Sequence, residues 1–200
     1  YRSLVNEQFS KAFTSQVSDW CEENGLLFTG HFACEDGLFD QMRASCGVMR
    51  QYADMSMPGI DHLGNRYTSP ILCKQVSSVA HQLGRPEVLS ETFGCAGWQI
   101  SFDRLRWIWG RQNVLGITKP CFHLAAYSMT GRRKRDYPAF FSYHEPWWDQ
   151  FPDLMTWVDG LCSLMKEGDG LVDWLVLSPI DSVKSLYPSD KANAYSAEYG

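Results

Sequence analysis

The sequence predicts an α/β fold made of parallel strand–helix–strand units, and two observations support it. Four short apolar runs begin roughly 30 residues apart, about the length of one strand–helix unit, with helical patterns between them. Each run also ends in side chains able to do chemistry. Ligands and catalytic groups gather at the carboxyl ends of parallel strands, so the runs point to an active-site face. They cover residues 26–31, 59–62, 88–91 and 121–128.

Helices are predicted between and after these strands, some with clear end signals. Ser69 is the expected N-cap of the third helix, Pro70 takes its first position, and Gly84 ends it. Ser101 is the expected cap of the fourth helix. The predicted helices cover residues 4–23, 38–52, 69–83, 101–113 and 148–168.

The chain looks like a piece of a longer protein. Its 200 residues suffice for one domain, but a complete (β/α)8 barrel needs about 250. It begins at Tyr1, almost at once in a helical pattern, and ends soon after an apolar run over 172–179. We expect that run to be a strand that opens a separate α/β domain, with the polar tail from Asp181 as the severed start of that domain.

Composition limits the classes of partner and the compartment. The formal charge of −5 with 20% charged residues gives no reason to expect a nucleic acid or an anionic membrane as partner. Seven scattered cysteines without a Cys-x-x-Cys pair are expected to be reduced, buried thiols, which favours a cytoplasmic protein. The residues do not indicate an oligomeric state.

Glu91 is the first candidate for catalysis. It follows the buried run Val88-Leu89, and Gly94 lies in the loop after it. A glutamate at such a position is costly to desolvate unless it is paired or used. Trp98 on the same loop is a candidate platform for a sugar ring. The alternative is an ion-paired, structural glutamate.

The segment after the first strand supplies further candidates. Glu35 and Asp36 precede a predicted helix, so either carboxylate could reach the cleft or simply lie at a helix N-terminus. For Asp36 the helix N-terminus is the favoured interpretation. His31 lies closer to the strand end and is a candidate for ligand contact.

The other strand ends offer binding residues. Asp61 is expected to bind a substrate hydroxyl or to orient a histidine, and His62 beside it shares that position; a structural pair is the alternative. His123 alternates with apolar neighbours, so a core histidine competes with a ligand contact. Tyr127 and Ser128 are plausible hydroxyls of the cleft.

Several other classes of site have weak support. No closely spaced histidine pair predicts a transition-metal site. Neither a Gly-rich phosphate loop nor a Gly-x-Ser-x-Gly elbow is present. The basic segment 131–136 is interpreted as a solvated loop or as a rim that binds an acidic substrate.

Together these segments resemble the second half of the catalytic barrel of glycoside hydrolase family 106, the α-L-rhamnosidase type. The order and spacing of the segments carry the resemblance over about residues 1–180. The resembling segments are residues 20–31, 57–61, 90–94, 134–138 and 142–148.

The resemblance implies the C-terminal half of a (β/α)8 glycosidase barrel over residues 1–168 and the truncated start of a following α/β domain over 169–200. It also implies a carbohydrate substrate and hydrolysis by two carboxylates, one as general acid and one as base or nucleophile. Glu91 fits the second role. The acid would lie upstream of Tyr1, with Glu35 as the alternative within this chain. Inversion and a bound calcium ion are further implications of the family.

Two rivals stay open. A metal-dependent barrel hydrolase or an aldolase would need convergent histidines or a lysine inside the barrel, and Lys119, beside Pro120, is poorly suited. A carbohydrate-binding relative would keep the cleft without its catalytic pair.

Overall fold

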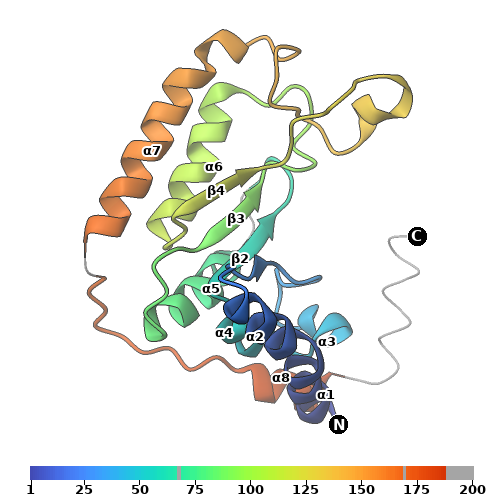
Figure 1. Cartoon of the computed structure of the whole chain (residues 1–200), viewed down its shortest axis with the longest axis vertical. Coiled ribbons are helices and arrows are strands. Elements are labelled where there is room, and N and C mark those ends of the chain that lie inside the picture. The colour runs from blue at the N-terminus through green and yellow to red at the C-terminus, as the bar shows by residue number, and fades with distance from the viewer. Residues whose placement is uncertain (67–68, 169, 188–200) are drawn as a thin grey trace.

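A single parallel sheet organises the chain. The computed structural model describes residues 1–66, 69–168 and 170–187. The strands lie in chain order and every neighbouring pair is parallel (Figure 1). They are β1 (Thr29–Gly30), β2 (Met57–His62), β3 (Leu89–Thr92) and β4 (Lys119–Phe122). This succession of parallel strands and connecting helices is a partial α/β barrel, as the sequence predicts.

Helices cover the sheet and connect its strands, and α6 and α7 pack against each other beside β3 and β4 (Figure 1). No helix in the described ranges is long and apolar enough to cross a membrane. A π-helical turn over Ser10–Thr14 joins the first two helices. The helices are α1 (Arg2–Phe9), α2 (Ser15–Glu23), α3 (Gln41–Ala44), α4 (Met49–Asp54), α5 (Pro70–Gln82), α6 (Phe102–Val114), α7 (Phe151–Glu167) and α8 (Ile180–Leu186), with short 3-10 helices η2 (Gly131–Arg135) and η3 (Trp148–Gln150).

Both expected serine caps are confirmed. The Ser69 hydroxyl accepts the backbone N–H of Ile71, and the Ser101 hydroxyl accepts that of Arg104, each at 3.2 Å. Such caps satisfy N–H groups that the first turn of a helix leaves without a partner, and each contributes about 1 kcal/mol. They fix where α5 and α6 begin.

Three predicted elements are divided or shortened in the structure. The helix expected over 38–52 is divided into α3 and α4, because Cys46 and Gly47 take positive φ angles of 58° and 128°. The first predicted strand is reduced to β1, and residues 123–128 leave the sheet after β4.

The strand expected over 172–179 is wrong. Residues 171–178 have no regular structure, and the large apolar side chains there are exposed. An apolar run forms a strand only where a neighbouring strand accepts its hydrogen bonds, and this run has none in the described part of the chain. Instead, α8 packs against α1, with Val183 buried. The rest of the predicted tail, from residue 188, lies outside the described residues.

The core lies between the sheet and its helices. Ile60 of β2, Val76 of α5 and Trp109 of α6 are completely buried within one apolar cluster. Burial of each such side chain contributes roughly 1.5–3 kcal/mol. The core therefore anchors the outer face of the strands and leaves their carboxyl ends to carry the site.

Gly59 sets the spacing between β1 and β2. A Cβ at this position would lie 2.7 Å from the backbone oxygen of Gly30 and 3.3 Å from the Leu89 side chain. We predict that Gly59→Ala forces the two strands apart and lowers the free energy of unfolding by about 1–3 kcal/mol in urea titrations. Gly160→Ala is the control: it lies in α7 with no atom within 4 Å, so helix propensity predicts a gain of up to about 1 kcal/mol. Equal stability of the two variants would contradict the prediction.

Candidate active site

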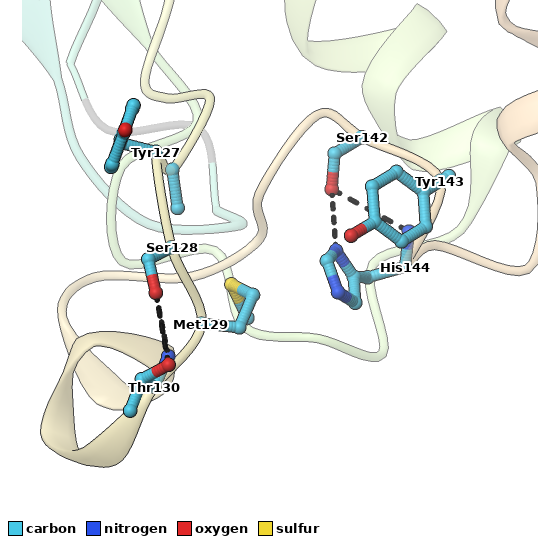
Figure 2. Close-up of a pocket in the computed structure, with 8 residues that line it drawn as sticks. Tyr127, Ser128, Met129, Thr130, Ser142, Tyr143 and His144 are labelled. Carbon is cyan, nitrogen blue, oxygen red and sulfur yellow. Dashed lines mark hydrogen bonds between the residues drawn. The ribbon is translucent and has the colours of Figure 1, made fainter.

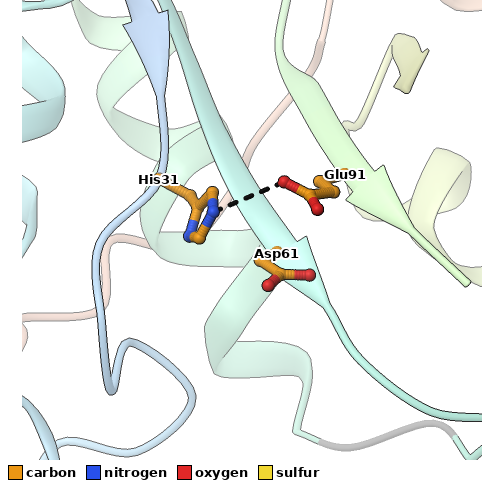
Figure 3. A group of neighbouring side chains, drawn as sticks. All are labelled: His31, Asp61 and Glu91. Carbon is orange, nitrogen blue, oxygen red and sulfur yellow. Dashed lines mark ion pairs between the residues drawn. The ribbon is translucent and has the colours of Figure 1, made fainter. Parts of the chain in front are cut away.

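Three predicted residues meet at the carboxyl ends of β1, β2 and β3. His31 follows β1, while Asp61 of β2 and Glu91 of β3 are register partners. One nitrogen or oxygen from each of the three side chains lies within 4.8 Å of the others, and Figure 3 shows them converging from three chain segments. The ends of these three strands therefore bring reactive side chains together in one compact cluster.

The direction of the Glu91 side chain follows from its neighbours on β3. Ser90 and Thr92 are fully buried on the opposite face, where both contact Gln112 of α6. The Ser90 hydroxyl donates to Gln112 Oε1 at 2.5 Å, and Gln112 Nε2 donates to Thr92 Oγ1 at 2.9 Å. Because side chains alternate along a strand, these bonds hold Glu91 on the inner face. Its side chain is 31% exposed, so a ligand can reach it.

Glu35 lies beneath the cluster as a buried structural acceptor. One carboxylate oxygen accepts the Asp61 N–H at 2.7 Å, and the other accepts the Phe32 N–H at 3.2 Å and the Tyr52 hydroxyl at 2.5 Å. The residue is only 2% exposed. Burial raises the pKa of Glu35 to about 7 against the opposing effect of these three donors. Glu35 therefore supports the site from within the protein and is not accessible to a ligand.

His31 lies between two carboxylates. Its Nε2 is 3.4 Å from Glu91 Oε2, and its Nδ1 is 4.0 Å from Glu35 Oε1. Both contacts become ion pairs when the imidazole is protonated. The ring is thus positioned to orient the Glu91 carboxylate.

The pKa of Asp61 lies above the ordinary value for an aspartate. Burial raises its pKa to about 6; the Glu91 charge adds to this, whereas His31 and His123 oppose it. One of its oxygens, Oδ1, is buried without a hydrogen-bond partner among the described residues. A ligand hydroxyl beside Asp61 could supply the missing donor.

The other predicted binding residues are dispersed. His123 packs against Gly94, where an added Cβ would lie 3.3 Å from its ring, and its charge acts on Asp61. His62 is fully buried on the face of β2 opposite Asp61, because adjacent residues of a strand point to opposite faces. Its expected contact with substrate is therefore wrong. Trp98 is half-buried with its edge against Phe140.

Tyr127 lies in a separate pocket outside the cluster, on the segment that leaves the sheet after β4 (Figure 2). Tyr52, which donates its hydroxyl hydrogen bond to Glu35, is a residue of the site that the sequence did not predict. It ends the predicted helix over 38–52, and the signal that could have identified it is its hydroxyl, which needs a hydrogen-bond partner when the residue is buried.

The family resemblance suggests a bound calcium ion. Calcium takes six to eight oxygen ligands, whereas His31, Asp61 and Glu91 offer one imidazole and two carboxylates. This donor set does not fit calcium. It is closer to the mixed nitrogen and oxygen sets that bind transition metals.

The Tyr52 hydroxyl bond gives a pH-dependent prediction. The folded-state pKa of Glu35, about 7, exceeds the ordinary 4.5, so its contribution to stability is full below pH 4.5 and is lost as the pH rises through about 7. Tyr52→Phe removes a donor that favours the ionised form. We therefore predict a small loss of stability at low pH that grows to about 1.5–3 kcal/mol above pH 7, measured by urea unfolding. Tyr127→Phe, at a fully exposed position, is the control. A loss independent of pH would contradict this account.

Comparison with known proteins identifies a structural neighbour. The fold is similar to that of a rhamnosidase from Novosphingobium sp. PP1Y, with a TM-score of 0.68 over 84% of this chain and 18% sequence identity. The chain covers 16% of that protein. No protein-family model matches the chain, and no curated protein matches it. At this level of identity the likeness shows a rhamnosidase-like fold, and membership of glycoside hydrolase family 106 stays a prediction.

Proposed function

We propose that this chain forms part of the catalytic barrel of a glycoside hydrolase, with Glu91 as its base or nucleophile. The observation that carries the proposal is the reachable Glu91 carboxylate at the end of β3, held in register with Asp61 and 3.4 Å from His31. The rhamnosidase-like fold supports it. An α-L-rhamnoside is therefore the first substrate to test.

Glycoside hydrolysis needs two carboxyl groups on opposite sides of the scissile bond. Glu91 would attack the sugar or activate water, and His31 would hold its carboxylate in place. Glu35, the earlier candidate for the acid, is buried and fully hydrogen-bonded, which suits a positioning residue. We propose that the general acid comes from a part of the barrel outside this chain.

Asp61 would bind a sugar hydroxyl. Its buried Oδ1 lacks a donor, and an ionised carboxylate accepts a hydroxyl hydrogen bond that contributes about 1.5–3 kcal/mol. His123 lies near enough to act on the Asp61 charge and would lie beside the same sugar unit.

A metal-dependent hydrolase is the second candidate, because His31, Asp61 and Glu91 lie close enough to share one ion. Dialysis against a chelator discriminates the two. Activity that is lost and then restored by zinc or manganese, but not by calcium, would favour the metal-dependent reaction. A carbohydrate-binding relative without catalysis would bind sugar and hydrolyse no glycoside.

Replacement of Glu91 tests the proposal directly. We predict that Glu91→Gln in the full-length protein lowers turnover of a nitrophenyl α-L-rhamnoside by at least about 10²-fold, because the carboxylate supplies the base or nucleophile. Folding should be intact, since the side chain is partly exposed. Glu22→Gln, the same change at an exposed position of α2, should leave turnover unchanged. Near-normal turnover of Glu91→Gln would remove this residue from the mechanism.

The acidity of Asp61 predicts the acidic limb of the pH profile. Below its pKa of about 6 Asp61 takes up a proton and no longer accepts as an anion, so kcat/KM should fall as the pH drops through this value. Asp61→Asn cannot titrate, so it should lose this limb and show a lower plateau, by about 10-fold or more. Asp103→Asn, at an exposed position of α6, should keep the limb. An unchanged limb in Asp61→Asn would assign it to another group.

A further inference from the structure

A pocket opens beyond the carboxyl end of β4. It has a volume of about 490 Å³ and lies between the segments 126–130 and 142–144. Figure 2 shows the two segments facing each other across it, with Met129 between them. Its volume is in the range of small-molecule sites. None of the residues of the His31, Asp61 and Glu91 cluster lines it.

The lining combines aromatic faces with hydroxyl groups. Tyr127 is fully exposed and Tyr143 is 78% exposed. The Tyr143 ring lies 4.1 Å from the His144 ring at an angle of 31°, so one of its faces is covered and the other is open to a ligand. Ser128 and Thr130 form a hydroxyl pair at 3.0 Å, and the Ser142 hydroxyl lies 3.0 Å from His144 Nδ1. Aromatic rings with hydrogen-bonding groups beside them suit a sugar, which presents an apolar ring face and a rim of hydroxyls.

A concentrated positive charge borders this pocket. η2 begins directly after Thr130 and carries four consecutive basic residues, all exposed; they are Arg132, Arg133, Lys134 and Arg135. None of them forms an ion pair within the described ranges. The chain as a whole has a charge of −5. A cationic rim on an acidic chain attracts an anionic ligand, and Arg pairs well with a carboxylate.

Hydrogen bonds fasten this rim to the candidate active site. Trp98 Nε1 donates to the Lys134 carbonyl at 3.1 Å, and the Gly97 N–H donates to the Pro138 carbonyl at 2.7 Å. Trp98 and Gly97 belong to the loop that follows Glu91 on β3. The basic helix and the carboxylate cluster therefore lie at the same edge of the sheet, joined by a short connection.

We propose that this pocket and η2 form a subsite for a carboxylate-bearing sugar, a uronic acid unit of the substrate chain. Tyr127 and Tyr143 would contact the sugar ring, and Arg132 and Arg133 would bind its carboxylate. The inference rests on the proposed function, because it assigns the pocket to the same substrate as Glu91. It narrows the substrate class from any glycoside to an acidic oligosaccharide.

Calorimetry on the full-length protein with Glu91→Gln tests this without hydrolysis of the probe. The probes are trigalacturonic acid and its methyl ester, which differ in charge. We expect the acid to bind more tightly than the ester at low salt and to lose this advantage in high salt. Arg132→Ser with Arg133→Ser should lower the binding affinity for the acid by about 5- to 10-fold and leave the affinity for the ester unchanged. Tyr143→Ala should weaken both probes.

The control removes two exposed basic side chains elsewhere, by Arg50→Ser with Lys74→Ser on α4 and α5, and should not affect either probe. Equal binding of acid and ester, or equal losses in the arginine variant and the control, would overturn the subsite. An acid that binds with no effect of Tyr143→Ala would also overturn it, because a purely ionic surface for any polyanion explains that result. Turnover of the neutral nitrophenyl rhamnoside by the parent tests Glu91 separately, so the two proposals fail independently.

Discussion

The buried carboxylate of Glu35 is the interaction on which the site depends. β1 ends after Gly30, so its last carbonyls pair only with the first part of β2. Farther along, the Asp61 N–H would face the place of a missing strand residue, and Glu35 accepts it instead while also accepting the Phe32 N–H. A buried N–H without a partner costs about 1–3 kcal/mol. One side chain thus completes the sheet edge and fixes Asp61 of β2 relative to His31 after β1.

The position of Glu35 brings its carboxyl group close to two others. Three carboxyl groups, of Glu35, Asp61 and Glu91, converge at one edge of the sheet, and the pKa values of the first two are raised by burial. The imidazoles of His31 and His123 oppose this charge at Asp61. The site therefore holds protons near neutral pH that isolated carboxyl groups would release, a condition suited to acid–base chemistry.

The sequence predicts the repeating elements better than the details that direct side chains. The α5 and α6 starts follow from Ser69 and Ser101, because a cap is a local signal. The meeting of Asp61 and Glu91 follows from the equal spacing of strand ends. The burial of Glu35 does not follow, because this residue lies in a turn after β1 whose packing is set by distant segments of the chain. The burial of His62 on the face of β2 opposite Asp61 does not follow either, because a shift of one residue along a strand reverses its face and only tertiary packing sets it. The strand predicted over 172–179 is wrong for a related reason: no strand in the described part of the chain lies beside it to accept its hydrogen bonds.

The loop after β3 connects the Glu91 strand to the 131–138 segment through backbone hydrogen bonds. Phe93 and Cys95 have positive φ angles of 74° and 63°, conformations that cost about 1–3 kcal/mol each in residues with a side chain. Burial of Phe93 against Phe122 and Phe141 offsets this cost. The turned backbone directs the Cys95 and Gly97 N–H groups to the carbonyls of the 131–138 segment. Because this loop also leads back to Glu91, the main chain that holds the 131–138 segment is continuous with the strand that carries the carboxylate.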